Sequence, residues 1–391
     1  MTPSKIRKTA SRKPAAKAAR RARPSSRPAP RRKPGIAAKA PARSGGVPLL
    51  RRLSEACGVS GDEFAVRTII LEALKGKIKE ARIDALGNLL VRCRTRGKAS
   101  RRVMVAAHMD EVGLILMQPG SDGLWKFEIV GGVNEQTLPG KPVWIGKNRI
   151  PGVIGTKPIH LTEKEEREHP IKTDAMTIDI GAKDKDGASA AVKPGDRAAF
   201  ATPFHFERGV LFGKALDDRL GVAALIELAV DPPPGVELLA AFTTQEEIGL
   251  RGAQVAAHAL DPHLAIVLDA TPAIDMPMWD GSENVAYNTK LGGGPAIYIA
   301  DRGTISDARL VRLLRNAAEK RGIRYQIRQP RAGATDAAAI HLARAGIPSV
   351  SVSVPCRSPH GPVSTARFDD WRALLALVRA ALEDLGKHGL S

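Results

Sequence analysis

The chain has 391 residues, and 43% of them are hydrophobic, so it can bury a large core, and its length suggests two or three domains. Three scattered cysteines exclude a disulfide framework and a thiolate zinc site, and no apolar run approaches the roughly 18 residues that span a bilayer. The net charge of +19 is unevenly placed, because residues 1–46 contain 15 Lys or Arg and no Asp or Glu. The remainder is only mildly basic, and we expect a protein of a reducing cytoplasm with no membrane partner.

Residues 1–46 are rich in Ala, Pro, Lys and Arg and nearly devoid of large apolar side chains. Because such a segment cannot offset the entropy of ordering by burial, we predict a disordered basic tail. It lacks the apolar centre of a secretory signal, and its prolines oppose the amphipathic helix of an organelle transit peptide, which is the least favoured alternative. A sharper alternative to a solvated tail is non-specific contact with nucleic acid or another polyanion, because clustered cations release phosphate counterions.

Two short helices are predicted directly after the tail. Residues 47–76 contain two apolar segments separated by a glycine-containing break, and Ser60 and Asp62 are suitable caps for the second helix. A strand-like segment follows, and then the apolar strand that leads to His108.

The middle of the chain differs in amino-acid composition from the segments on either side. Residues 118–206 are dominated by Gly, Pro and short β-type runs, and we interpret them as a small β-rich domain inserted into a larger one. The larger domain then consists of residues 47–117 and 207–391. In its second part helices and strands alternate, as in doubly wound α/β sheets, and helices are expected at 217–229, 306–321, 335–345 and 368–385.

Six acidic and imidazole residues have an order and a local setting that suit a site for two divalent metals: His108, Asp217, Glu246, Glu247, Asp269 and His360. Most of them follow an apolar run typical of a strand, and these runs are 103–107, 236–243, 264–268 and 348–354. Because the carboxyl ends of neighbouring strands form the ligand crevice of an open α/β sheet, residues far apart in sequence can converge there.

His108 and Asp217 each have a carboxylate neighbour. A His at a strand end can bind a metal through one ring nitrogen while a carboxylate fixes the other, and Asp110 can supply that contact; mutual satisfaction of the two side chains is the alternative. Asp217 and Asp218 begin a predicted helix, where carboxylates often simply cap free N–H groups. One carboxylate can nevertheless bridge two cations, and Arg219 can neutralise whichever acid is not a ligand.

Glu246 and Glu247 closely follow a buried strand. On a surface helix such a pair carries no functional information, but at a strand end the chain can turn and present both side chains to one pocket. One can then bind metal while its neighbour moves protons. Asp269 ends an apolar run, and His360 lies in a loop rich in Pro and Gly, so a structural role is open for each.

The chain resembles a known family over essentially everything after Gly46, through LSEACGVSGDE, DALGNL, AAHMDEVG, GGVNEQTLPGK, GVIGTKPIHLT, IDIGA, GKALDDRLG, TTQEEIGLRGA, VLDAT, GGGPAI and GATDAAAIHLARAGIPSVSVSVP. It is similar to the cobalt- or zinc-dependent aminopeptidases of the glutamyl aminopeptidase and tetrahedral (TET) aminopeptidase group, also described as endoglucanase-like or deblocking aminopeptidases. The resemblance implies a doubly wound mixed sheet of the zinc-peptidase type with an inserted PDZ-like dimerisation domain. It also implies dimers that assemble further into dodecamers.

The same resemblance implies a role for each candidate residue. Asp217 bridges two metal ions, and its peptide bond to Asp218 is cis. One ion's shell is completed by His108 and Asp269, and the other's by Glu247 and His360. Glu246 is the general base, and Asp110 belongs to the catalytic set. The loop that carries His360 reads RSPHGPVS and departs from the family pattern, as does the basic tail.

Such a site supports hydrolysis. Two divalent ions outweigh three ligand carboxylates by one positive charge, which lowers the pKa of a bridging water to about 7 and gives a metal-bridged hydroxide. Glu246 would pass the proton to the leaving amine. Imidazole and carboxylate ligands suit Zn, Co or Mn. We expect an aminopeptidase that acts on peptides; the alternatives are a carboxypeptidase or another amidohydrolase on the same core, and a polyanion-associated protein that acts through its tail.

Overall fold

The computed structural model describes residues 46–99, 101–164, 168–282, 289–329 and 333–390. The predicted disordered tail therefore lies, except for Gly46, outside the described residues. None of the helices in the described ranges is long and apolar enough to cross a membrane.

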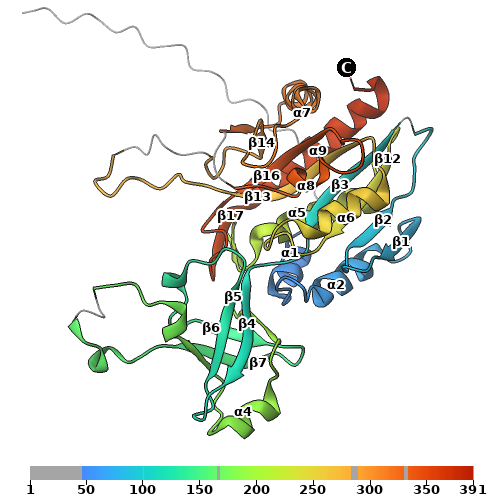
Figure 1. Cartoon of the computed structure of the whole chain (residues 1–391). Helices are drawn as coiled ribbons and strands as arrows, with labels where there is room; N and C mark the ends of the chain where they lie inside the picture. The colour runs from blue at the N-terminus through green and yellow to red at the C-terminus, as the bar shows by residue number, and fades with distance from the viewer. Residues whose placement is uncertain (1–45, 100, 165–167, 283–288, 330–332, 391) are drawn as a thin grey trace, which may run out of the picture. The chain divides into compact units, whose positions relative to one another are not determined.

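The larger domain is built on a mixed sheet that has 11 strands within the described residues (Figure 1). Its centre consists of four parallel neighbours in the order β12 (Glu237–Thr243), β3 (Arg102–His108), β13 (Leu264–Pro272) and β16 (Ser349–Arg357). Antiparallel strands extend the sheet on both sides, and β14 pairs with β15 in parallel. These flanking strands are β1 (Glu80–Ile83), β2 (Leu89–Arg92), β10 (His205–Glu207), β11 (Val210–Gly213), β14 (Ala296–Tyr298), β15 (Gln326–Arg328) and β17 (Ser364–Arg367).

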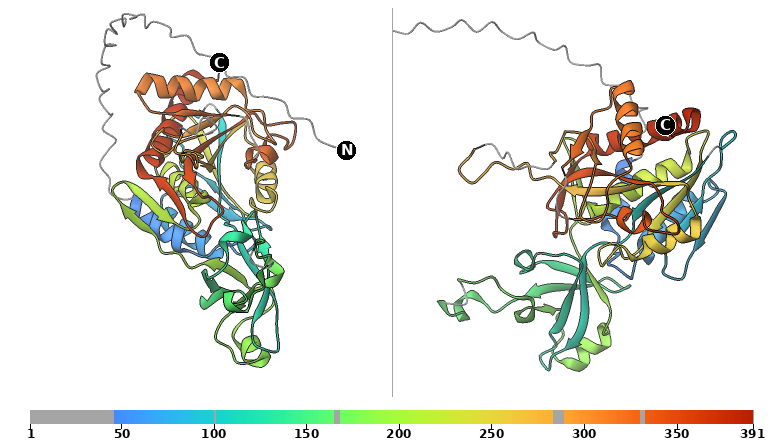
Figure 2. Two further views of the ribbon diagram at one scale, coloured as in Figure 1. Left: turned by 90° about the vertical axis from the view of Figure 1, so that its left-hand side faces the viewer. Right: turned by 45° about the horizontal axis from the view of Figure 1, so that its top comes forward.

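Helices cover both faces of the sheet (Figure 2). Successive strand residues point to opposite faces, so Val103 and Val105 of β3 join one core cluster while Met104 and Ala106 join the other. The first cluster is shared with α1 (Gly46–Glu55), α2 (Phe64–Leu74), α5 (Leu216–Val230), α7 (Ala308–Arg321) and α9 (Phe368–His388). The second is shared with α6 (Arg251–Leu260) and α8 (Ala337–Ile340). This two-sided burial explains the nearly continuous apolar runs inside β3, β12 and β13, whereas the buried strand β16 alternates Ser and Val.

Most predicted helices are confirmed, with three differences. The helix expected at 335–345 is only Ala337–Ile340, because Arg344 and Gly346 have positive φ and turn the chain toward β16. The helix α6 was not predicted, because the residues on its buried face are mostly Gly and Ala and not large apolar side chains, although they follow helical spacing. The predicted N-cap residues of α2, Ser60 and Asp62, were also wrong. The N-cap residue is Glu63, and the Ser60 hydroxyl donates instead to Asp110.

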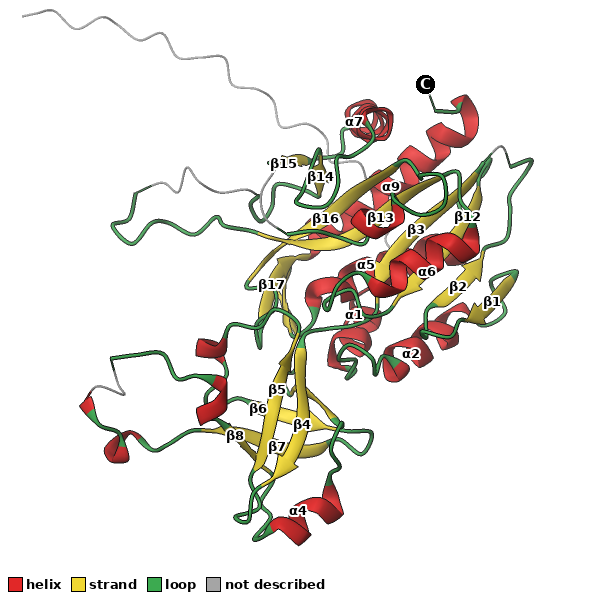
Figure 3. Cartoon of the chain, in the orientation of Figure 1, coloured by secondary structure: helices red, strands yellow, loops and turns green. Residues whose placement is uncertain are grey.

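A separate small antiparallel barrel is formed by β4 (Gly113–Pro119), β5 (Trp125–Val130), β6 (Pro142–Ile145), β7 (Ile150–Gly155), β8 (Thr177–Asp179) and β9 (Arg197–Phe200) (Figure 3). It has its own core around Trp125, Phe127 and Ile178. Short helical segments lie in its loops: η1 (Glu135–Thr137), η2 (Ile159–Leu161), η3 (Thr173–Ala175) and α4 (Lys185–Ala191). The domain boundary predicted at residue 118 falls inside β4, because no change of composition marks the strand's first residues.

Candidate metal centre

The candidate residues lie at the carboxyl ends of the four central parallel strands. His108 is the last residue of β3, Glu246 and Glu247 follow β12, Asp269 lies within β13, and His360 follows β16. Asp217 reaches the same place from the first turn of α5. Parallel strands bring their carboxyl ends to one edge, so the topology itself gathers side chains that are 252 residues apart in sequence between the first and the last.

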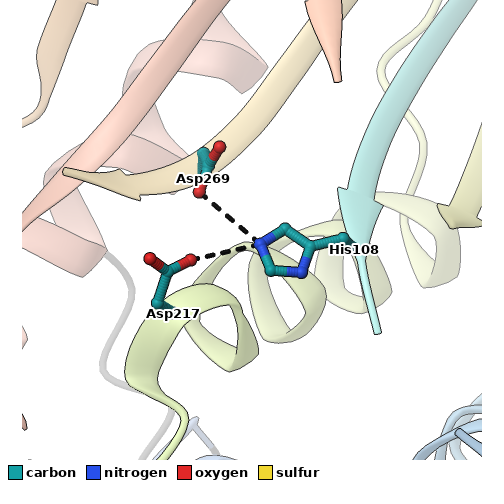
Figure 4. A group of neighbouring side chains, drawn as sticks. All are labelled: His108, Asp217 and Asp269. Carbon is teal, nitrogen blue, oxygen red and sulfur yellow. Dashed lines mark hydrogen bonds and ion pairs between the residues drawn. The ribbon is translucent and has the colours of Figure 1, made fainter. Parts of the chain in front are cut away.

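A first group consists of His108, Asp217 and Asp269, all nearly fully buried (Figure 4). The Nε2 atom of His108 lies 3.1 Å from Oδ1 of Asp217 and 3.8 Å from Oδ1 of Asp269. One ligand atom from each residue lies within 4.8 Å of the others. Three such atoms around one point suit a small divalent cation.

A second group consists of Asp217, Glu247 and His360. The Nε2 atom of His360 lies 3.4 Å from Oδ2 of Asp217 and 3.2 Å from Oε2 of Glu247. Asp217 therefore presents Oδ1 to the first group and Oδ2 to the second. The side chain of His360 is 39% exposed, so the second group borders solvent whereas the first does not.

The backbone at the start of α5 places Asp217 between the two groups. Ala215 has left-handed φ, Asp217 and Asp218 have non-helical dihedral angles, and the peptide bond between them is cis, as predicted. Asp218 is fully buried; its Oδ1 accepts a hydrogen bond from the N–H of Gly221, and its Oδ2 has no partner among the described residues. Burial, and then the charge of Asp269, raise the pKa of Asp218 well above its usual range.

Arg219 does not neutralise Asp218, so that prediction was wrong. Its guanidinium donates to the carbonyls of Leu53, Met109 and Asp110, and it lies 3.1 Å from Glu111. Glu111 also accepts two hydrogen bonds from the buried ammonium of Lys214, at 2.7 and 2.8 Å. This buried network holds the backbone just after His108 in place, because the guanidinium of Arg219 donates to the carbonyls of Met109 and Asp110.

Asp110 connects His108 to the glutamate pair. Its Oδ1 accepts from the N–H of Glu246 at 3.0 Å, and its Oδ2 accepts from the N–H of Glu247 at 3.1 Å and from Ser60 at 2.6 Å. The Nδ1 atom of His108 lies 3.2 Å from the carbonyl oxygen of Asp110 and 3.4 Å from its Oδ1. A proton on Nδ1 leaves Nε2 free for a cation.

The loop that carries His360 is held by hydrogen bonds at both ends. Arg357 Nε donates to Oδ1 of Asp275 at 2.6 Å, and the hydroxyl of Ser364 donates to the carbonyl of Ser358 at 2.9 Å. His360 itself has a positive φ of 57°. A Cβ at Gly132 would lie 3.3 Å from its imidazole Nδ1, a close contact that would shift the ring by a few tenths of an ångström.

Glu246 lies beside the two groups but belongs to neither. It is half-buried, and burial together with the charges of Asp269 and Asp336 raises its pKa well above the usual range, although the charge of His108 opposes this. Asp336 was not singled out from the sequence, and only its place in the GATDAAA stretch pointed to it. It is buried, accepts from Thr243 at 2.5 Å, and has one oxygen without a partner among the described residues.

Without a metal ion, the carboxyl groups of the site lie too close together for all of them to be ionised near neutral pH. Burial and the charge of Asp217 raise the pKa of Glu247 to about 8 and that of Asp269 to about 7. Burial also lowers the pKa of His360, but its hydrogen bond to Asp217 outweighs this and brings the pKa to about 9. Hydrogen bonds from both imidazoles depress the pKa of Asp217, although burial opposes them. Imidazole and carboxylate donors without thiolate fit Zn, Co or Mn.

Metal uptake is therefore expected to release protons and to strengthen as the pH rises. Glu247 and Asp269, with pKa values of about 8 and about 7, carry protons in the metal-free site near neutral pH, and a cation must displace them. The apparent metal affinity should fall steadily as the pH is lowered from about 9 to about 6. Titration calorimetry in buffers of different ionisation enthalpy measures the released protons. Uptake that is independent of pH and releases no proton would contradict the assignment of these two carboxylates.

Comparisons of this chain with protein families, with curated relatives and with solved structures all point to one family of aminopeptidases. A family model described as M42 glutamyl aminopeptidase matches residues 87–377. A lysyl aminopeptidase of Pyrococcus furiosus is 32% identical over 345 residues, which are 86% of this chain and 96% of the relative. The structure of a TET aminopeptidase from a marine sediment archaeon of the Thaumarchaeota has a TM-score of 0.83 at 32% identity, covering 88% of this chain and 99% of its own.

The TET1 peptidase of Pyrococcus horikoshii, which can assemble into a tetrahedron or a large octahedral shell, is 33% identical, with a TM-score of 0.75 and coverage of 86% of this chain and 98% of its own. The mixed sheet and the separate antiparallel barrel described above match the folds of these TET aminopeptidases.

Proposed function

This chain belongs to the M42 glutamyl aminopeptidase family, whose members are metallopeptidases, and we propose that it is a dinuclear aminopeptidase that removes N-terminal residues from peptides. The observation that carries the dinuclear assignment is the position of Asp217. Its two carboxylate oxygens face two different groups of ligand atoms, each completed by one imidazole and one further carboxylate. A carboxylate that offers one oxygen to each group can bridge a pair of cations about 3.5–4 Å apart.

We propose His108 and Asp269 as ligands of one ion, Glu247 and His360 as ligands of the other, and Asp217 as the bridge, with Zn or Co as the ions and Mn as a further candidate. Two bound divalent ions supply positive charge that acidifies water and polarises the scissile carbonyl. Glu246 takes the proton from water and returns it to the leaving amine, and its raised pKa suits a base that must also release a proton.

Asp110 acts as a positioning residue in this proposal. Its two oxygens accept from the N–H groups of Glu246 and Glu247 and so fix the base and a ligand relative to each other. It also lies against the ring nitrogen of His108 that faces away from the cation. A carboxylate beside the ring nitrogen that does not bind the metal sets the orientation and the basicity of a metal-bound imidazole.

The substrate experiment separates an aminopeptidase from the other hydrolases that use such a core. Peptides with a free N-terminal amine should be hydrolysed from that end, whereas acetylated copies of the same peptides should remain intact. The measurement is mass spectrometry of both products after incubation with the metal-loaded protein. Cleavage of only the blocked peptides, or release of C-terminal residues, would favour the carboxypeptidase or amidohydrolase alternative.

We further propose that the β-rich region 118–206 is a PDZ-like dimerisation domain, and that the chain forms homo-oligomers from dimer to dodecamer. Two observations support this: the assembly reported for the Pyrococcus horikoshii TET1 peptidase, and exposed apolar side chains on the barrel loops, such as Ile159 and Leu161. Helices on both faces of the sheet support a doubly wound, zinc-peptidase type of catalytic domain from residues 47–117 and 207–391.

The cellular setting and the basic tail are also proposals. The three cysteines are free in the described structure, which supports a reducing cytoplasm. Polyanion or nucleic-acid contact through residues 1–46 is supported only by their composition, because they lie almost wholly outside the described residues.

A further inference from the structure

Basic side chains gather at the end of the sheet opposite to the metal centre. The metal centre lies at the carboxyl ends of the central strands, whereas residues 75–79, 94–99 and 101 and the end of α9 lie at their amino ends. Because β3 has seven residues, about 20 Å separates the two ends. Seven cations at the amino end form what is called here the basic surface: Lys75, Lys77, Lys79, Arg94, Lys98, Arg101 and Lys387.

Backbone contacts make the basic surface continuous. Arg94 donates to the carbonyl of Gly76 at 2.7 Å, which joins the end of β2 to the turn after α2. The N–H of Gly235 donates to the carbonyl of Arg96, and Gly235 in turn packs against Gly386 in α9. Figure 1 shows the end of α9 on the same side as the start of β12. Three segments distant in sequence therefore present one surface.

These cations have no carboxylate partner among the described residues. Lys77 and Arg94 contact only backbone carbonyls. Four acids at this end are paired with other arginines: Glu237 with Arg92, Asp231 with Arg96 and Arg379, Asp261 with Arg102 and Arg344, and Asp384 with Arg321. The exposed Glu80 beside Lys79 offsets one of the seven positive charges. The surface thus keeps most of its positive charge instead of cancelling it within the molecule.

The surface is also hollowed. A cavity of about 620 Å³ is lined by Arg101, His263 and Lys387, together with Pro262 and three glycines. None of the exposed large apolar side chains in the described chain lies at 75–79, 94–101 or 387. A membrane-binding surface would present apolar side chains for insertion, and a single-strand-binding surface would present aromatic rings for stacking.

Protection of a sheet edge does not explain why the cations of the basic surface gather at this end of the sheet. Edge strands often carry charges that oppose pairing with another chain, and β1 is an edge strand here. However, β1 contributes only Glu80 and Arg82, whereas the cations of the basic surface lie beyond the strand ends, where no free edge needs protection.

We propose that the basic surface binds the phosphodiester backbone of a nucleic acid, without reading its sequence. Spaced, solvated cations without aromatic neighbours suit phosphate contacts, whose affinity comes from counterion release. The site lies away from the metal centre, so peptidase activity and nucleic-acid binding are separable properties of this chain. The proposal does not depend on the function assigned to the metal centre.

The test compares two charge-reversal variants of the full chain. The surface variant carries Lys75→Glu, Lys79→Glu and Lys98→Glu; the matched control carries Lys147→Glu, Lys183→Glu and Lys185→Glu, which are exposed on the barrel. Binding to a fluorescein-labelled DNA duplex is measured by anisotropy over a series of salt concentrations. The surface variant should bind at least about tenfold more weakly than the wild type at 0.1 M salt, and its log–log salt slope should be shallower by about 2–3.

Because residues 1–45 are identical in all three proteins, the difference between the variants reports the basic surface and not the tail. The control variant should keep the affinity of the wild type within about threefold, and the surface variant should hydrolyse an aminoacyl reporter at the rate of the wild type. Equal weakening of both variants would overturn the proposal, because only net charge would then matter. Wild-type binding to vesicles of phosphatidylcholine and phosphatidylserine in equal parts, without binding to the duplex, would also overturn it.

Discussion

Replacing Glu246 with Gln is expected to lower kcat by about 10³-fold while both metal ions remain bound. Glutamine keeps the shape of the side chain but cannot accept a proton, and Glu246 contributes no atom to either ligand group. The N–H of residue 246 still donates to Asp110, so the turn that carries the side chain is preserved. The measurement is kcat on an aminoacyl reporter together with the metal content of the purified variant.

The neighbouring substitution Glu247→Gln is the matched control, because it makes the same chemical change one residue along. Glu247 lies 3.2 Å from His360 in the second group, so this variant should lose one metal ion. The pair of variants thus separates proton transfer from metal binding. If Glu246→Gln kept more than a tenth of the activity, or lost metal as Glu247→Gln does, the general-base assignment would be wrong.

Replacing Asp217 with Asn is expected to remove both metal ions and to lower kcat/KM by at least about 10⁴-fold, since Lewis-acid assistance is worth several kcal/mol. An amide has one acceptor oxygen and no charge, so it cannot serve two cations. The effect should be larger than for any other single ligand, because only Asp217 contributes to both groups. Metal content by plasma mass spectrometry and activity on the reporter check this.

Asp218→Asn is the control for Asp217, since it changes an adjacent buried carboxyl that belongs to neither ligand group. Its Oδ1 accepts only from the N–H of Gly221, a contact that the amide oxygen can keep. This variant should retain both ions and a melting temperature close to that of the wild type. Two ions bound to folded Asp217→Asn protein would contradict the bridging role.

Strand periodicity predicted where the candidate residues lie, because each apolar run ends at the same edge of a parallel sheet. His108, Asp269 and the glutamate pair could be placed from this rule alone. Asp217 could not, since its oxygens are directed by a local backbone conformation that carries no periodic signal. Its bridging role came from the resemblance to the family, and so did the division of ligands between the two groups.

Contacts between distant segments were least predictable. Arg219 was expected to pair with its neighbour Asp218, but its long side chain reaches Glu111 and the carbonyls after His108. Ser60 looked like a helix cap and instead donates to Asp110. Nothing local to Asp336 showed that it would be buried against Thr243, because that contact depends on how α8 packs on the sheet. Sequence patterns fix which end of a strand a residue occupies, but not the partner of a flexible polar side chain.

The most direct test of the paired-cation site is anomalous diffraction from crystals of the zinc-loaded protein, recorded on both sides of the zinc absorption edge. Two peaks about 3.5–4 Å apart should flank the carboxylate of Asp217, one beside His108 and Asp269 and the other beside Glu247 and His360. A single peak, or two peaks of which neither touches Asp217, would contradict it.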